Sequence, residues 1–161
     1  MFSIGDKIVY PVHGAGVVEG IEEKEVLGEK KSYYILRLWG DEMRIMIPQD
    51  QAYHAGLRKV GNEELLERAL LILQEDVDDV ALNWNKRLRQ NMDKIKSGNI
   101  CQVAEVVRNL MVRDLRKGLA NGEKKLLDSA KQILVSEIAV SQNLEEEQAY
   151  DLVDSCFHLD C

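Results

Sequence analysis

The stretch of this sequence with the clearest chemistry is a tryptophan among cations. Trp84 follows Asn83, and Lys86, Arg87 and Arg89 come directly after it. Asn83 is a suitable N-cap, because its side-chain oxygen can accept a hydrogen bond from a free N–H of a helix's first turn. The pattern therefore predicts a helix that begins at Trp84 and carries a cluster of positive charge near its start.

Two interpretations of Trp84 are open from the residues alone. Helical spacing places it on one stripe with Leu88, Met92 and Ile95. It could therefore begin an ordinary core stripe, since large aromatic side chains are usually mostly buried. Alternatively, it presents a flat apolar surface between cations. Such a group suits a nucleic acid, because cations neutralise phosphates while an apolar side chain wedges into a base step.

The positive charge of the chain is confined to the segment that contains Trp84. The 161 residues carry a net charge of −7, yet residues 83–125 carry 11 Lys and Arg against 4 Asp and Glu. Residues 61–82 and 126–161 carry net charges of −6 and −7, and residues 1–60 carry −1. Local sign matters more to a phosphate partner than the total charge. We therefore expect the whole chain to bind free DNA only weakly.

No catalytic, cofactor or metal site is expected. An enzyme needs an activated group held by a partner, whereas His13, His54 and His158 are dispersed and lie in no nucleophile motif. The glycines after His13 lack the strand–loop–helix context and the Lys-Ser/Thr pair of a phosphate loop. Cys156, His158 and Cys161 lie close together in sequence, but a closed zinc site needs four ligands. The absences favour a binding protein without a small-molecule substrate.

Residues 1–60 are predicted to form a small β domain. Short runs rich in β-branched and aromatic residues are separated by turn signals that contain Gly or Pro. The runs are residues 8–10, 15–21, 33–39 and 43–47, and Pro48 closes the last because it cannot donate to a ladder. Several short strands in so short a segment indicate a strongly bent sheet or partial barrel of the SH3 or Tudor kind.

Residues 61–161 are predicted to form a compact all-helical domain of about five helices. Gly98 and Gly118 are expected to end two of them. Capping boxes are expected where Gln102 follows Asn99 and where Glu146 follows Asn143. The asparagines at or beside the expected helix starts are Asn62, Asn83, Asn99, Asn121 and Asn143. The order of a β domain before an α domain, without alternation, predicts the α+β class.

The sequence predicts a cytoplasmic protein. No run of residues approaches the length of a membrane span, and the first residues do not form a signal peptide. The odd number of cysteines in the helical half suits reduced thiols.

A set of short motifs spans the chain as far as about Ser141. In the β domain they are residues 5–11 (GDKIVYP), 13–16 (HGAG) and 45–48 (IMIP). In the helical domain they are residues 83–84 (NW), 103–110 (VAEVVRNL), 117–119 (KGL), 122–125 (GEKK) and 130–135 (AKQILV). In combination these motifs are specific, and the chain resembles the CarD/CdnL family of bacterial RNA polymerase-binding transcription regulators.

The resemblance implies a role for each domain. The family's Tudor-like N-terminal domain docks on the polymerase β subunit, and its helical domain contacts promoter DNA at the upstream edge of the transcription bubble. A tryptophan of that helical domain wedges into the minor groove and favours the open complex. It matches Trp84, with Lys86, Arg87 and Arg89 around it. The protein would then be a non-catalytic regulator, associated with the nucleoid through polymerase.

The resemblance also implies a polymerase-binding surface. Lys24 matches a position where relatives carry a basic contact residue, and Met46 falls where some relatives have a second basic contact and others methionine. Arg44, together with Trp39, is expected to contribute to the same surface.

A second function class remains beside the first. The chain could be an adaptor whose helical domain binds another protein, with Trp84 as a core residue or a protein hot spot. The change of charge at residue 83 is the feature that separates the two, because an adaptor does not require it.

Overall fold

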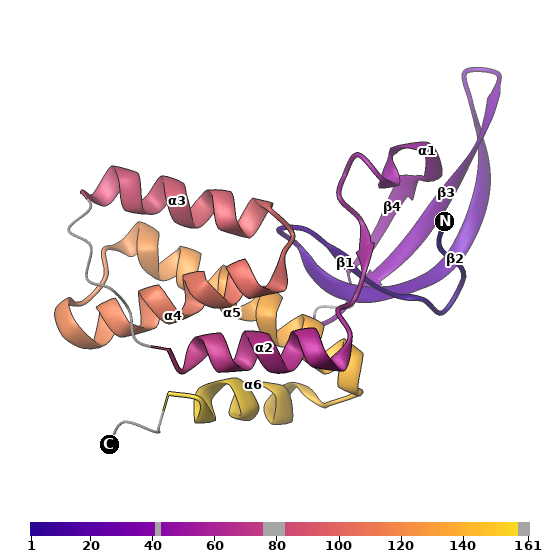
Figure 1. Cartoon of the computed structure of the whole chain (residues 1–161). Coiled ribbons are helices and arrows are strands. Elements are labelled where there is room, and N and C mark those ends of the chain that lie inside the picture. Colours follow the sequence, from indigo (N-terminus) through magenta and orange to yellow (C-terminus); the bar gives the residue numbers. More distant parts are fainter. Residues whose placement is uncertain (41–42, 76–82, 158–161) are drawn as a thin grey trace.

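The computed structural model describes residues 1–40, 43–75 and 83–157. Within them, an antiparallel sheet is followed by a bundle of helices, which confirms the predicted α+β order (Figure 1). The sheet has the order β4-β3-β2-β1-β5. Its strands are β1 (Lys7–Tyr10), β2 (Gly14–Val26), β3 (Glu29–Leu38), β4 (Arg44–Pro48) and β5 (Arg58–Lys59), and the short helix α1 (Gln49–Ala52) follows β4.

Each of the four predicted runs matches a strand, although Trp39 and Met43 lie one residue outside β3 and β4. Strands β2 and β3 extend well beyond the predicted runs as a long hairpin. Alternation explains the sheet's core, because successive side chains of a strand point to opposite faces. Tyr34, Leu36 and Ile47 face the β core together with Ile8 and Val18. The hairpin projects away from the rest of the molecule (Figure 1).

The glycines after His13 have a packing role. Gly14 has a φ of 110°, a backbone conformation that side-chain-bearing residues rarely adopt. A Cβ on Gly16 would collide with the backbone carbonyl of Arg37 on β3. These glycines therefore allow β2 to start with a tight turn and approach β3 closely, as the absence of phosphate-loop context indicated.

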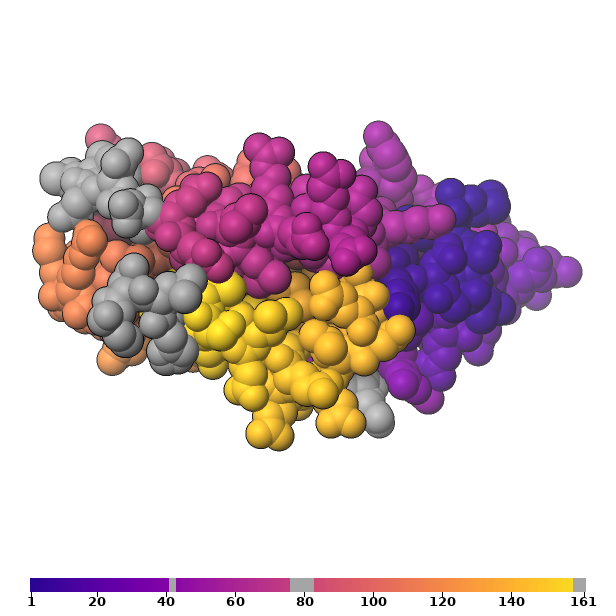
Figure 2. Space-filling view, turned by 60° about the horizontal axis from the view of Figure 1, so that its bottom comes forward, coloured from indigo at the N-terminus to yellow at the C-terminus, as the bar shows by residue number. Residues whose placement is uncertain are grey.

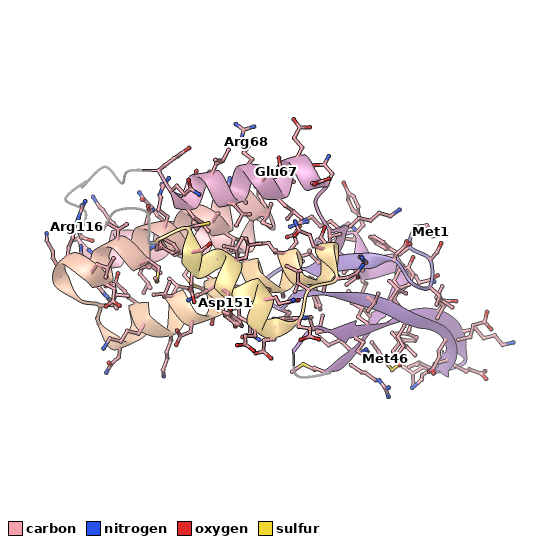
Figure 3. All side chains as sticks on the ribbon, turned by 90° about the horizontal axis from the view of Figure 1, so that it is seen from below. Met1, Met46, Glu67, Arg68, Arg116 and Asp151 are labelled. Carbon is pink, nitrogen blue, oxygen red and sulfur yellow. The ribbon has the colours of Figure 1, made fainter. Side chains whose placement is uncertain are left out.

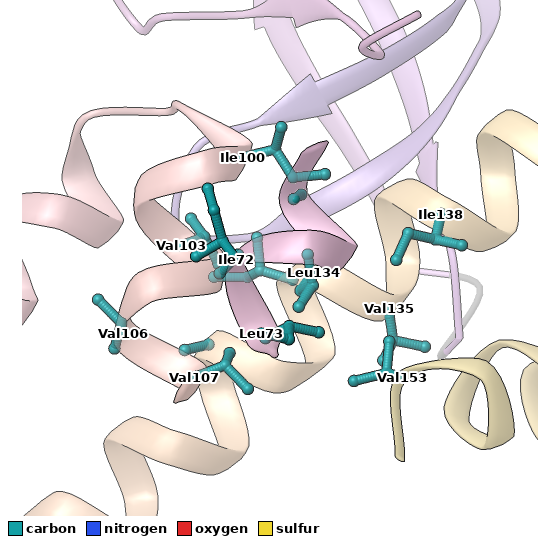
Figure 4. Close-up of a cluster of buried hydrophobic side chains, with 14 of the residues drawn as sticks. Ile72, Leu73, Ile100, Val103, Val106, Val107, Leu134, Val135, Ile138 and Val153 are labelled. Atoms are coloured by element: carbon teal, nitrogen blue, oxygen red, sulfur yellow. The ribbon is translucent and has the colours of Figure 1, made fainter. Parts of the chain in front are cut away.

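Helices build the second half of the described chain. They are α2 (Glu63–Leu73), α3 (Trp84–Lys96), α4 (Ile100–Lys117), α5 (Asn121–Gln142) and α6 (Glu146–Ser155). The central helix α5 packs on α4 and α6, and its Leu134, Val135 and Ile138 are fully buried with residues of α4 such as Val107 (Figure 4). Figure 2 shows α2 and α6 side by side on one face of this bundle. Of the described helices, none has the length and apolar character needed to cross a bilayer.

Three of the predicted N-caps are confirmed. The side chains of Asn62, Asn83 and Asn99 accept backbone hydrogen bonds at the starts of α2, α3 and α4. Asn99 accepts its bond from the N–H of Cys101, 2.9 Å away. Gly98 and Gly118 follow or close their helices with positive φ, as expected.

Two predicted helix starts are wrong in detail. Asn121 is the first residue inside α5, whose N-cap is Ala120 without a side-chain cap. Asn143 ends α5 in the left-handed conformation with a φ of 55°, and α6 instead starts at a capping box between Glu145 and Gln148. Asparagine suits both an N-cap and a left-handed helix end, so the residue type alone does not distinguish them.

Helix α5 also binds the sheet. The backbone N–H of Ala15 donates to the buried Ser136 Oγ at 2.9 Å. Glu137, which is 1% exposed, accepts two hydrogen bonds from Arg58 at 2.9 and 2.7 Å and one from the N–H of Gly61 at 2.8 Å. These polar contacts join the two halves of the chain, and no local sequence pattern indicated them.

Candidate nucleic-acid interface

Trp84 is the first residue of α3 and keeps 44% of its surface exposed. Its N-cap is formed as predicted, with the N–H of Lys86 donating to Asn83 Oδ1 at 2.8 Å. The indole lies over the start of α5, since its Cζ2 is 3.8 Å from where a Cβ on Gly122 would be. The ring therefore has one supported side and substantial exposed surface.

The stripe that Trp84 begins becomes buried only further along the helix. Leu88 and Met92 are half-buried against the helical core, and Ile95 is buried. This gradient follows from the position of Trp84, because the first turn of α3 extends to the end of the bundle away from the sheet (Figure 1). The geometry is that of an exposed aromatic group on a helix tip, and not of a core tryptophan.

Three helix ends meet at this end of the bundle, namely the start of α3, the end of α4 and the start of α5 (Figure 1). Positive residues gather there from all three helices. We call this surface the Trp84 end, and it comprises Trp84, Lys86, Arg87, Arg89, Arg113, Arg116, Lys117, Lys124 and Lys125. The predicted set contained only the α3 members. The net positive charge of residues 83–125 was the sequence signal that could have identified the others.

The cations of α3 differ in what they contact. Lys86 and Arg89 are exposed and make no ion pair with any residue in the described ranges. Lys94, further along, is 3.0 Å from Glu105 of α4. Near the start of α3, Lys86 and Arg89 are therefore the cations that remain available to a partner.

Arg87 is held inside the molecule. Its Nε and one terminal nitrogen donate to the two carboxylate oxygens of Glu123, each at 2.9 Å. The hydrogen bond and charge of Arg87 hold the pKa of Glu123 below its usual range against the opposing effect of burial, and the positive charge of Arg113 adds to the lowering. The same hydrogen bond raises the pKa of Arg87. Both groups are therefore charged at neutral pH.

The polymerase-surface candidates Lys24, Arg44 and Met46 share one face of the sheet. Directly paired residues lie on the same face of a sheet, and alternate residues of a strand do so too. The partners of these candidates on β3 are Lys31, Arg37 and Ile35 respectively, all in alternate positions. We call this surface the outer sheet face.

The outer sheet face is mixed in character. Met46 is 40% exposed on β4, which is the edge strand at one side of the sheet. Arg44 is exposed and its Nε is 3.1 Å from a carboxylate oxygen of Glu19. Trp39 does not belong to this face, because it is half-buried against the helical core and its ring lies 6.4 Å from that of Tyr150.

The Trp84 end and the outer sheet face lie far apart on an elongated molecule. Arg116 of the former lies at the left end of the molecule in Figure 3, and Met46 of the latter lies in the sheet, in the right half. No group of three His, Cys, Asp or Glu side chains that could hold a metal ion occurs in the part of the chain that the structure describes. His158 and Cys161 lie outside the described residues.

Comparisons with known proteins match two successive parts of the chain. Residues 2–61 match the family model of the CarD-like/TRCF RID domain, and residues 68–154 match that of the CarD C-terminal domain. The chain is 45% identical over 148 residues to the putative transcription factor YdeB of Bacillus subtilis (strain 168). The matched residues cover 92% of this chain and 97% of YdeB.

Two solved structures from Myxococcus xanthus match the N-terminal part. The match to the 72-residue N-terminal domain of CarD has 34% sequence identity and a TM-score of 0.32. It covers 37% of this chain and 79% of the CarD domain. The match to CdnLNt has 48% sequence identity and a TM-score of 0.35. It covers 39% of this chain and 89% of CdnLNt.

Proposed function

The chain belongs to the CarD/CdnL family of transcription regulators, and we propose that it docks on the RNA polymerase β subunit and stabilises the promoter open complex. In this proposal the Trp84 end contacts promoter DNA at the upstream edge of the bubble, and the outer sheet face binds polymerase. The protein acts without catalysis, by linking the two partners.

The observation that carries the DNA part is the exposure of Trp84 on a helix tip among cations. An exposed indole supported on one side can enter a minor-groove base step and unstack it partly. Lys86 and Arg89 then neutralise phosphates on either side, and the cations of α4 and α5 extend the positive surface. A rigid aromatic group loses little conformational entropy on insertion, since its ring has few rotatable bonds.

The polymerase part rests on the outer sheet face. Lys24 and Arg44 supply positive charge, and Met46 supplies exposed apolar surface beside an unpaired edge strand. Such an edge can accept a further strand from a partner, with backbone hydrogen bonds for affinity and side chains for specificity. The CarD-like/TRCF RID family match over residues 2–61 supports polymerase as that partner.

The decisive experiment compares Trp84→Ala with Leu115→Ala. Leu115 lies in the last turn of α4 at the same end and is 77% exposed, so the control removes an exposed apolar side chain nearby. We expect Trp84→Ala to shorten the open-complex lifetime by about tenfold, because unstacking a base step costs a few kcal/mol that the indole offsets. Leu115→Ala should leave it unchanged. Equal lifetimes for wild type and Trp84→Ala would refute the wedge and favour an adaptor.

The docking part is tested with a matched pair in the β2–β3 hairpin. Lys24→Glu changes the outer sheet face, whereas Lys30→Glu makes the same charge change at the neighbouring register position, on the opposite face. We expect Lys24→Glu to weaken binding to the β subunit and Lys30→Glu to leave it close to wild type. Equal weakening by both variants would indicate a general charge effect and not this face.

A further inference from the structure

We propose that the ion pair between Arg87 and Glu123 fixes the position of Trp84, so that Arg87 is a positioning residue and not a phosphate contact. The role of this pair in DNA binding rests on the proposed function, in which Trp84 contacts promoter DNA. The ion pair assigns different roles to Arg87 and Arg89, which have the same residue type and lie two positions apart in the sequence.

The pair engages two of the three nitrogens of the guanidinium. Two nitrogens of Arg87 donate to two oxygens of one carboxylate at 2.9 Å, the bidentate arrangement that sets orientation as well as distance. The Arg87 side chain is 19% exposed and that of Glu123 is 2% exposed. Turning these two nitrogens toward a phosphate would leave a buried carboxylate unpaired, which is strongly unfavourable.

The pair and the indole contact the same turn of α5. Glu123 binds Arg87, and its neighbour Gly122 lies next to Cζ2 of Trp84. Arg87 in turn is three residues after Trp84, which places the two on neighbouring positions of the helix surface. The first turn of α3 is thus attached to the first turn of α5 at two adjacent points.

Helix α3 has little else to hold this turn. Its buried residues are Asn91 and Ile95, both in its second half. Lys94 pairs with Glu105 and Arg58 donates to the carbonyl of Gly98, and both contacts also lie toward the far end of the helix. The ion pair with Glu123 therefore connects the first turn of α3 to the bundle, and the angle of Trp84 follows from it.

The two roles of Arg87 predict opposite effects of Glu123→Gln. If Arg87 binds phosphate, removing the carboxylate frees a cation and lowers the local negative charge, so the open complex should last longer. If Arg87 positions Trp84, the same substitution loosens the first turn of α3, and the lifetime should fall severalfold. We expect the fall.

A measurement on the free protein tests the positioning without DNA or polymerase. In a Trp39→Phe background, Trp84 is the tryptophan that remains. We expect Arg87→Gln and Glu123→Gln each to increase quenching of its fluorescence by acrylamide and to shift its emission to longer wavelength. Lys86→Gln, which removes an exposed cation two residues from Trp84, is the matched control and should change neither.

Unchanged quenching in folded Glu123→Gln overturns the inference, whatever the lifetimes show. If a neutral variant fails to fold, Arg87→Lys and Glu123→Asp keep both charges while removing the bidentate geometry, and they face the same criterion. The proposed function fails separately, when Trp84→Ala leaves the open-complex lifetime unchanged. A longer lifetime for Glu123→Gln would return Arg87 to the phosphate contacts.

Discussion

At the scale of residues, the exposure of Trp84 follows from its place as the first residue of α3. A residue there has no preceding helical turn beside it, and the neighbouring α5 places the small residue Gly122 next to the ring. The same turn of α5 supplies the buried Glu123 that binds Arg87. A small residue and a charged residue, adjacent in sequence, therefore support the indole and hold its helix.

Acid should weaken the ion pair between Arg87 and Glu123 and thereby lower the stability of the fold. Arg87 lowers the pKa of Glu123 in the folded protein, so the unfolded chain takes up a proton at a higher pH than the folded one. The stabilisation is present above roughly pH 4.3, where an unfolded glutamate titrates, and is lost as the pH falls through the lower folded pKa. We expect wild type to lose more stability than Glu123→Gln in urea unfolding below that pH. Parallel losses would contradict the coupling.

Leu27 occupies a backbone conformation that suits asparagine better. It is fully exposed at the tip of the β2–β3 hairpin with a φ of 53°, followed by Gly28 with a φ of 81°. Positive φ at both positions of a two-residue turn is the type I′ arrangement, which favours Asn-Gly. We expect Leu27→Asn to raise the free energy of unfolding by about 1 kcal/mol in urea titration. Leu27→Ala keeps the strain and should have little effect, so equal effects would argue against this cause.

At the scale of elements, α5 connects the two halves of the protein. One part of its surface completes the helical core, and Ser136 and Glu137 meet the start of β2 and the segment around Arg58. The outer sheet face and the Trp84 end are consequently carried on elements that contact the same helix. The proposed bridging function requires such a connection, because docking on polymerase would position Trp84 at DNA only if the intervening structure is stiff.

Glu137→Gln tests how strongly this connection stabilises the fold. Removing one partner of a buried ion pair leaves the other charge poorly compensated, and we expect a loss of about 3 kcal/mol in the free energy of unfolding. Arg44→Gln is the control, since its pair with Glu19 is exposed and should contribute less than about 1 kcal/mol. Urea unfolding of both variants provides the comparison. A loss for Glu137→Gln no greater than the control would show that the pair is not a structural link.

At the scale of the whole molecule, charge is segregated. The Trp84 end is positive, whereas α2 and α6, side by side in Figure 2, carry exposed acidic residues. Figure 3 shows Glu67 and Asp151 on these two helices, and Arg116 at the end of the bundle. DNA is attracted to one end of the protein and repelled by this acidic face, so the charge distribution orients an encounter more than it adds affinity.

Binding to free duplex should therefore be weak and dependent on salt. Each neutralised phosphate contributes a slope of roughly −0.9 in a plot of log Kobs against log salt concentration. We expect Lys86→Gln with Arg89→Gln to reduce the steepness by about twice that amount. Lys30→Gln, on the distant hairpin, should leave the slope unchanged. A slope insensitive to the double substitution would remove these two cations from the interface.

Much of the architecture was determined by sequence alone, because it depends on local backbone geometry. Runs of β-branched and aromatic residues between turn signals in residues 8–47 indicated strands, and helical spacing with Asn62, Asn83 and Asn99 as caps indicated helices. The change of charge at residue 83 located the positive segment. Asn143 was misassigned because asparagine suits both a helix start and a left-handed helix end. The surrounding structure decides between the two.

Tertiary structure decided which of several equivalent residues does what. Lys86, Arg87 and Arg89 are alike in the sequence, and only the packing of α5 gives Arg87 a buried partner 36 residues away. The Arg58–Glu137 link spans 79 residues, and Lys24, Arg44 and Met46 come to one face only through strand register. Periodicity specifies how a segment folds, whereas contacts between distant segments depend on how whole elements pack, which no local pattern encodes.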